Sequence, residues 1–152
     1  MLKKNYFQKL KNSNKVFVIA EAGSNHLKNL KRAYKLIDIA KNSGADAVKF
    51  QSFTADEIAV DNLKYNKIKN KFKKFSKNLY DFYKRYELPP EFNLKLYKYC
   101  QKKKIHFMTS IFGNDSLKIS KNLSPVIKIA SFEANYFELL NELIKIKKHI
   151  II

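Results

Sequence analysis

The chain has 152 residues, 45% of them hydrophobic and 14% aromatic. This is long and apolar enough for one folded domain, and it excludes a disordered polypeptide. Lys and Arg number 31 against 13 Asp and Glu, which gives a formal net charge of +18. Such a charge makes anionic molecules candidate partners. Net charge affects solubility and non-specific binding, however, and says little about the fold. Most of the cations are Lys, which A/T-rich codons encode, so we favour genomic bias as the source of the charge.

A single cysteine, Cys100, excludes an internal disulfide and gives no support to an oxidising compartment. Residues 1–15 are polar and Lys-rich and resemble no signal peptide. Nowhere does the sequence approach the ~20 apolar residues of a membrane span. We therefore expect a cytoplasmic protein that does not contact the membrane.

Strands and helices are predicted to alternate along the chain. Residues 16–21 are β-branched and apolar, and turn residues 23–25 lead into a helix whose apolar residues keep helical spacing until Gly44. Residues 45–51 form the next apolar run. Strand, helix and strand within roughly 30 residues are typical of a βαβ unit, so the two strands should be parallel neighbours.

The alternation continues after an insertion at residues 52–88. Pro89-Pro90 begins a helix that leads to a strand at 105–110. Asn114 or Asp115 can cap a short helix that reaches Leu123. A strand at 126–130, a helix from Asn135 and an apolar run at 149–152 follow. Four strand–helix units and the start of a fifth strand predict an α/β fold with a parallel sheet, either open and doubly wound or closed as an eightfold barrel.

Polar residues stand at the end of each of the four complete strands. The carboxyl ends of parallel strands form the functional face of such folds. Lys49 and Lys128 lie in otherwise apolar strands, where a cation is costly without an anion. Together with Thr109 and Ser131 they predict a pocket for an anion. Glu21 can serve to neutralise Lys49 or to act as a general acid or base, and the two roles are compatible. The residues of this edge are Glu21, Asn25, His26, Lys49, Gln51, Thr109, Ser110, Lys128 and Ser131.

Asn25 and His26 are candidate loop contributors to the site. His26 can be a metal ligand or an acid–base group, and it can equally be a hydrogen-bonded loop residue. No two histidines have ligand spacing, so the chain is expected to contain no metal site of its own. Phosphate-loop glycine motifs are absent from the sequence, which leaves nucleotide cofactors without support.

Residues 64–86 contain nine Lys or Arg against one acid, with aromatic residues interleaved. This segment could bind nucleic acid or an anionic surface as a non-enzymatic basic module. We favour the alternative of a solvated helix that packs an aromatic stripe on the domain, because any amphipathic surface helix shows this spacing. Nucleic acid is therefore not an expected partner.

Three segments carry a family resemblance. They are Val-Ile-Ala-Glu-Ala-Gly-Ser-Asn-His at 18–26, Gly-Ala-Asp-Ala-Val-Lys-Phe-Gln at 44–51 and Lys-Ile-Ala-Ser-Phe-Glu at 128–133. In order and spacing they resemble the sialic acid synthase family, the synthases of N-acetylneuraminate, legionaminate and pseudaminate. The resemblance implies the N-terminal half of a TIM (β/α)8 barrel, with residues 1–152 as one partial synthase domain. The second half of the barrel and the C-terminal sugar-capping domain of the family are not in this sequence.

The resemblance also implies an activity. Members of the family condense phosphoenolpyruvate with an N-acetylated amino sugar such as N-acetylmannosamine, use a divalent metal, Mn or Mg, and are usually homodimeric. By the same resemblance, Lys49, Thr109, Lys128 and Ser131 hold phosphoenolpyruvate. Glu21, Gln51 and Glu133 face the sugar or the reacting centre.

The family's metal-binding histidines have no counterpart in these 152 residues. Half a barrel also leaves open sheet edges and unburied apolar faces. The 152 residues alone are therefore expected to be inactive and poorly stable.

Two departures from the family pattern affect loops. Leu27-Lys28 stands where the family usually has Asn-Gly, and Thr109-Ser110-Ile111-Phe112 stands where it has Thr-Pro-Phe. Both departures make the local loop shape uncertain from sequence. Residues 51–56 and 130–133 look slightly more like the pseudaminate branch than the neuraminate branch.

Overall fold

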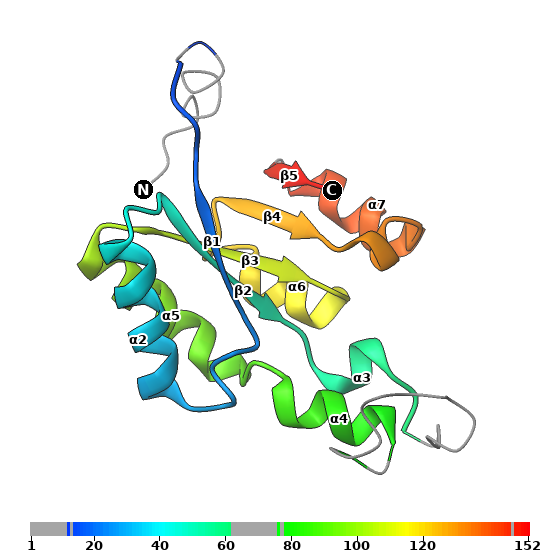
Figure 1. The fold of residues 1–152 in the computed structure, drawn as a ribbon. Coiled ribbons are helices and arrows are strands. Elements are labelled where there is room, and N and C mark those ends of the chain that lie inside the picture. Colours follow the sequence, from blue (N-terminus) through cyan, green and yellow to red (C-terminus); the bar gives the residue numbers. More distant parts are fainter. Residues whose placement is uncertain (1–11, 13, 62–75, 77, 147) are drawn as a thin grey trace.

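The protein is described by a computed structural model that covers residues 12, 14–61, 76, 78–146 and 148–152. Five parallel strands form one sheet in the order β1-β2-β3-β4-β5 (Figure 1). The strands are β1 (Ile19–Gly23), β2 (Ala47–Ser52), β3 (His106–Ile111), β4 (Val126–Ile129) and β5 (His149–Ile151).

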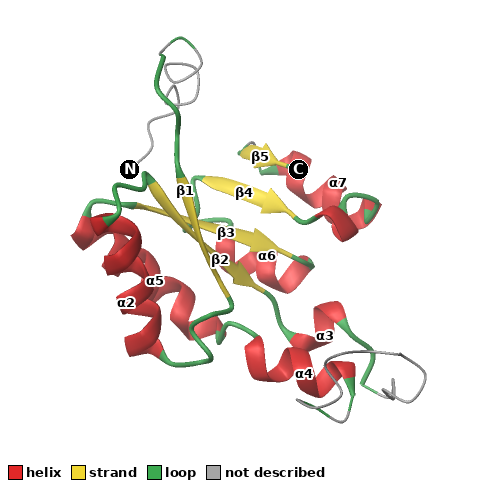
Figure 2. Ribbon diagram, in the orientation of Figure 1, coloured by secondary structure: helices red, strands yellow, loops and turns green. Residues whose placement is uncertain are grey.

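Helices separate successive strands along the chain (Figure 2). Between β1 and β2 lies α2 (Leu30–Asn42), and between β2 and β3 lie α3 (Ala55–Ile58), α4 (Leu79–Tyr86) and α5 (Pro90–Lys103). The β3–β4 connection contains α6 (Asn114–Ser120). A 3-10 turn, η2 (Ser131–Glu133), and α7 (Phe137–Lys145) connect β4 to β5.

The strand order decides between an open doubly wound sheet and a barrel. In a doubly wound sheet the order reverses at a switch point, so that helices cover both faces. Here every strand pairs with the strand before it in the sequence. Right-handed crossovers that all run in one direction place their helices on one face, and α2, α5 and α6 lie together on one side of the sheet (Figure 1). The expected first half of a (β/α)8 arrangement is confirmed.

The face of the sheet that meets the helices forms the main core. Alternate residues of the strands point to this face. Val48, Phe50 and Phe107 pack with buried residues of α2 and α5. Ile127 and Ile129 pack with residues of α6 and α7 in a second cluster. This packing holds the strands in register.

The inner face of the sheet has an apolar floor. Ala47, Met108 and Val126 are 0%, 0% and 1% exposed, and the partly buried Phe17, Ile19 and Ile151 pack against them. The expected unburied apolar face is therefore partly covered, because Phe17 before β1, Ile19 of β1 and Ile151 of β5 pack against these three residues. Two residues further along each of β1 to β4 the inner face becomes polar.

Two helix starts differ from the sequence prediction. Gly113, not Asn114 or Asp115, is the cap of α6, because the Ser116 hydroxyl accepts hydrogen bonds from the backbone N–H of Phe112 and of Gly113, at 3.0 and 3.1 Å. Similarly, α7 begins at Phe137 rather than at Asn135. The residues before it form η2, and the Tyr136 N–H donates back to the Glu133 carbonyl at 3.0 Å.

The turn between β1 and α2 uses left-handed backbone at two consecutive residues. Leu27 has φ +48° and Lys28 has φ +54°. Asn and Gly tolerate this conformation well, whereas other side chains meet the backbone and are destabilised. The chain therefore keeps a turn that suits Asn-Gly, although its own residues fit it poorly. The turn is fixed by hydrogen bonds such as that from Asn29 N–H to the His26 carbonyl, at 2.9 Å.

The proposed basic helix lies mostly outside the described residues. Its described C-terminal part is α4, where Tyr83 packs edge-on against Phe53 with ring centroids 5.8 Å apart and Phe82 contacts Tyr86 at 4.8 Å. Lys84 and Arg85 are exposed. Within α4, the aromatic side chains pack on the domain and the cations are exposed, as predicted for a solvated surface helix. None of the helices in the described part of the chain is long and apolar enough to cross a bilayer.

The strained turn gives a stability test. Replacing Leu27 with Asn should raise the free energy of unfolding by about 0.5–1 kcal/mol, because Asn accepts left-handed backbone and the Leu27 side chain is 47% exposed. Chemical denaturation of purified protein measures the change. Leu27→Ala is the control for loss of the leucine's apolar atoms, since Ala also lacks those atoms but has no side-chain amide to favour left-handed backbone. Equal stabilities of the Asn and Ala variants would contradict the backbone explanation.

Candidate active site

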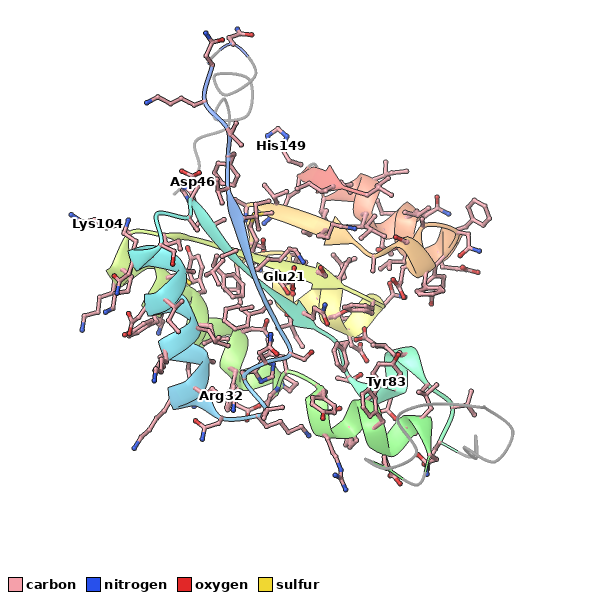
Figure 3. The ribbon with its side chains drawn as sticks, in the orientation of Figure 1. Glu21, Arg32, Asp46, Tyr83, Lys104 and His149 are labelled. Carbon is pink, nitrogen blue, oxygen red and sulfur yellow. The ribbon has the colours of Figure 1, made fainter. Side chains whose placement is uncertain are left out.

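Lys49 is the centre of a polar cluster on the inner face of the sheet. Its ammonium forms an ion pair with the Glu21 carboxylate on the neighbouring strand. The same ammonium donates a hydrogen bond to the Ser110 hydroxyl of β3 at 3.2 Å. The Lys49 side chain is 14% exposed, whereas that of Glu21 is 48% exposed, and Glu21 stands over the middle of the sheet in Figure 3. Glu21 therefore neutralises Lys49, as one of the two interpretations of Glu21 expected.

Lys128 extends this cluster to a fourth strand. It pairs in register with Ser110, which places its side chain on the same inner face. The Lys128 ammonium donates to the backbone carbonyl of Ile129. Two lysines thus lie on either side of the Ser110 hydroxyl across adjacent strands. An anion with several oxygens can engage both ammonium groups and the hydroxyl from this face.

Gln51 lies next to Lys49 on the inner face, one step nearer the carboxyl end of β2. The Ser24 hydroxyl donates to Gln51 Oε1 at 3.3 Å, so the amide presents its N–H groups away from Ser24. Gly23 has φ +51°, and a Cβ at this position would lie 3.2 Å from Glu21 Oε1 and 3.8 Å from Gln51 Nε2. A glycine at residue 23 therefore leaves room for both side chains.

Glu133 and Ser131 follow β4 in the 3-10 turn η2. Ser131 is exposed, and Glu133 Oε2 is buried without a hydrogen-bond partner in the described structure. Burial raises the pKa of the Glu133 carboxyl, although a backbone hydrogen bond and the Lys128 charge act in the opposite direction. A carboxyl of this kind keeps its proton to a higher pH than an exposed one and is suited to proton transfer.

Thr109 does not join the cluster. It pairs in register with Phe50 and faces the helices, where it is 0% exposed. Its hydroxyl lies 2.7 Å from the Ser52 hydroxyl and 3.3 Å from the Phe50 carbonyl oxygen. Strand residues alternate between faces, so the next residue, Ser110, lies beside Lys49. Ser110 is therefore where the family resemblance had implied Thr109. Ser110 lies two residues after Met108, so the sequence indicates that the two side chains share a face of the sheet. Only the strand register shows that this is the face of Lys49.

His26 and Asn25 remain in the loop after β1. His26 is 0% exposed, its Nδ1 accepts a hydrogen bond from the Lys28 N–H at 3.0 Å, and its ring lies 6.3 Å from that of Phe50 on the helix side. Asn25 donates to the Ala22 carbonyl at 3.1 Å. The structure thus gives His26 the hydrogen-bonded loop role, and neither residue contacts Lys49 among the interactions described.

The described residues do not by themselves fit a divalent metal. Among residues 12, 14–61, 76, 78–146 and 148–152, no three His, Cys, Asp or Glu side chains gather as ligands. The Glu21 carboxylate is paired with Lys49 and His26 Nδ1 already accepts a hydrogen bond. The metal that the family resemblance implies stays a prediction.

Glu87, which the sequence did not reveal, clamps the loops beside the site. Its Oε1 accepts from the ammonium groups of Lys28 and Lys84 at 2.9 and 3.3 Å, and its Oε2 accepts from the Ala55 N–H at 3.0 Å. Burial, the largest single influence, raises the pKa of Glu87, but the hydrogen bonds from Lys28, the Ala55 N–H and Lys84 together with the Lys28 charge outweigh it, so the pKa is lowered. This carboxylate joins the loop after β1 to the start of α3 and the end of α4.

Glu57 makes a second clamp between α3 and α6. Its Oε1 accepts from the Ser116 N–H at 2.8 Å and from the Ser116 hydroxyl at 3.0 Å, and its Oε2 accepts from the Thr54 N–H at 3.2 Å. A Cβ on Gly113 would lie 2.6 Å from Glu57 Oε1, so only glycine leaves room for the carboxylate there. Glu57 thereby ties the segment after β2 to the loop after β3.

A known protein family matches most of this chain. The NeuB family model matches residues 36–152. The chain therefore belongs to the NeuB family. The matched residues contain four of the five parallel strands, β2 to β5.

Relatives and a solved structure match most of this chain. The spore coat polysaccharide biosynthesis protein SpsE of Bacillus subtilis is 36% identical over 140 residues, which are 90% of this chain and 36% of that protein. A pseudaminic acid synthase of Campylobacter jejuni is 34% identical over 139 residues, 91% of this chain and 40% of the synthase. The crystal structure of an N-acetylneuraminic acid synthetase from Leptospira borgpetersenii superposes with a TM-score of 0.71 at 28% identity, covering 90% of this chain and 44% of that one. The chain thus spans about two fifths of the length of the proteins it matches.

The buried imidazole gives a pH test. Burial, followed by the charges of Arg32 and Lys28, lowers the pKa of His26 from 6.5 to about 4. The unfolded chain then binds more protons than the folded chain between these values, so stability is full above pH 6.5 and falls as the pH drops toward 4, by about 3 kcal/mol from this residue. Urea denaturation of wild type and His26→Gln between pH 7 and pH 4 measures it. The Gln variant should lose less stability across the window, and parallel curves would contradict the assignment.

Proposed function

We propose that this chain supplies the phosphoenolpyruvate-binding part of a synthase that condenses phosphoenolpyruvate with an N-acetylated amino sugar. The observation that carries the proposal is the Lys49 cluster. A partly buried ammonium in a parallel strand is stabilised by Glu21 and Ser110, and Lys128 stands in register beyond the hydroxyl. Membership of the NeuB family and the pseudaminic acid synthase relative support the same chemistry.

The proposed binding mode follows from the charges. Phosphoenolpyruvate carries a phosphate and a carboxylate, which need cationic and hydroxyl donors in a shared pocket. Lys49 and Lys128 provide the cations, and Ser110 and Ser131 provide hydroxyl groups at the ends of β3 and β4. Lys49 has to exchange part of its contact with Glu21 for the ligand, which leaves the Glu21 carboxylate available to the sugar.

The proposed reaction forms one carbon–carbon bond and, at C2, replaces the carbon–oxygen bond to phosphate with one to water. C3 of phosphoenolpyruvate adds to the sugar aldehyde carbon, and water adds at C2 and gives up one proton, which balances the proton taken up by the aldehyde oxygen. Phosphate then leaves with the electron pair of its C2–O bond and the second water proton, so that C2 becomes a ketone. Glu133, whose pKa burial raises, is suited to hold the proton for the aldehyde oxygen. Gln51 presents N–H donors, and Glu21 presents a carboxylate, for the hydroxyl and acetamido groups of the sugar.

Binding of phosphoenolpyruvate to the purified chain tests the proposal. Lys49→Met should raise the dissociation constant by about tenfold or more, because a hydrogen bond to a charged group is worth roughly 1.5–3 kcal/mol. Isothermal titration calorimetry at low salt measures the constant. The control is Lys118→Met, which removes a 71%-exposed ammonium on α6 and should leave binding unchanged.

Ser110 provides a second test of the same site. Ser110→Ala should weaken phosphoenolpyruvate binding by about fivefold through the loss of one hydroxyl contact, in line with the ~1 kcal/mol of a neutral hydrogen bond. Equal losses for Lys118→Met and Lys49→Met would mean that net charge alone attracts the ligand. No binding by the wild-type chain would contradict the proposed function.

A further inference from the structure

Three buried polar side chains meet directly behind the polar cluster, on the helix side of the sheet. Ser52 ends β2, Thr109 belongs to β3, and Asn93 lies in the first turns of α5; they are 3%, 0% and 1% exposed. A buried polar group needs a hydrogen-bond partner to offset its desolvation, whereas an aliphatic residue of similar size at the same position would need none. The three residues supply those partners to one another.

The hydrogen bonds of this trio have one consistent direction. The Ser52 hydroxyl donates to Asn93 Oδ1 at 2.5 Å. A serine hydroxyl has a single proton, so with that proton on Asn93 the 2.7 Å contact between Ser52 Oγ and Thr109 Oγ1 is made by the Thr109 proton. The Ser110 and Phe50 carbonyl oxygens, at 3.1 and 3.3 Å, are longer alternative acceptors for the same Thr109 proton. Asn93 Nδ2 in turn donates to the Pro90 carbonyl at 3.3 Å. We call this chain from Thr109 through Ser52 to Asn93 the buried relay.

The buried relay holds the two strand ends that carry the proposed binding residues. Ser52 follows Gln51, and Thr109 precedes Ser110, so each of the two relay residues in strands is one step from a side chain on the inner face. Gln51 and Ser110 are themselves paired in register. A shift of either strand end on the helix side therefore moves the Gln51 amide and the Ser110 hydroxyl relative to Lys49, whose hydrogen bond to Ser110 is 3.2 Å long.

We propose that Asn93 is a positioning residue for the anion site and that it acts through Ser52 and Thr109. The side chain does not reach the inner face, so its effect on the ligand passes through the strand ends. This inference rests on the proposed function, because its main measurement is phosphoenolpyruvate binding.

The test compares variants that separate hydrogen bonding from packing. Asn93→Leu and Thr109→Val remove a relay group at nearly constant volume, and each should raise the dissociation constant for phosphoenolpyruvate about fivefold or more. Thr109→Ser keeps the hydroxyl but removes a buried methyl group. It should lower the melting temperature while binding phosphoenolpyruvate as wild type does. All variants are measured well below their melting temperatures.

The outcomes distinguish this inference from its alternatives. If Thr109→Val weakens binding and Asn93→Leu does not, Thr109 acts by itself and the relay is overturned. If Thr109→Ser weakens binding as much as Thr109→Val, general destabilisation is the cause and the inference also fails. If Thr109→Val does not fold, Asn93→Leu decides the question. If Asn93→Leu does not fold, Ser52→Ala takes its place, because it removes the hydroxyl that links Asn93 to Thr109; binding as in wild type by Ser52→Ala would overturn the relay.

A measurement without ligand separates this inference from the proposed function. Loosened strand ends should speed amide hydrogen exchange at Gln51 and Ser110 about fivefold in Asn93→Leu relative to wild type. Exchange at Val48 and Phe107, near the other end of the same strands, should not change. Faster exchange at Gln51 and Ser110 would support the relay whether or not phosphoenolpyruvate binds. If phosphoenolpyruvate does not bind to the wild type, that result contradicts only the proposed function. Unchanged exchange would overturn the relay.

Discussion

The ammonium of Lys49 is the group on which the polar half of this structure depends. It lies in a strand whose neighbours on the helix side are fully buried, and a cation in such a place needs oxygen partners to offset its desolvation. Glu21 and Ser110 provide them from the strands on either side. The same arrangement is poised for an anionic ligand, because a multivalent anion can replace part of the Glu21 contact and add contacts to Lys128.

The two faces of the sheet perform different tasks. The helix face is an apolar core with the buried relay at its carboxyl end, and the inner face has an apolar floor of Ala47, Met108 and Val126 beneath its polar cluster. Around the rim, Glu87 and Glu57 join the loops after β1, β2 and β3 by accepting hydrogen bonds from the Lys28 ammonium and from the backbone N–H groups of Ala55 and Ser116. The loops are therefore fixed by carboxylates that come from the insertion after β2, which gives this segment a structural reason to be present.

Much of the fold was predictable from the sequence because it follows from local patterns. Strand and helix periodicity, Pro90 at the start of α5 and Gly44 after α2 predicted every strand and most helices of the described chain to within a few residues. The starts of α6 and α7 were wrong, since Ser116 and the 3-10 turn at residues 131–133 depend on contacts that local sequence does not contain. Leu27 and Lys28 adopt a left-handed turn that their residue types disfavour, so tertiary packing overrode local preference there.

The sequence by itself determined that lysines, acids and hydroxyl groups gather at the carboxyl ends of parallel strands, because strand periodicity and chain order require it. Only the tertiary structure decided which hydroxyl meets Lys49. Residues 109 and 110 point to opposite faces, and the register between β2 and β3, set by packing of the whole core, assigns Ser110 to the site and Thr109 to the buried relay. Residue patterns alone also left open the choice between a doubly wound sheet and half a barrel. The family resemblance implied half a barrel, and the strand order, which long-range pairing fixes, confirmed it.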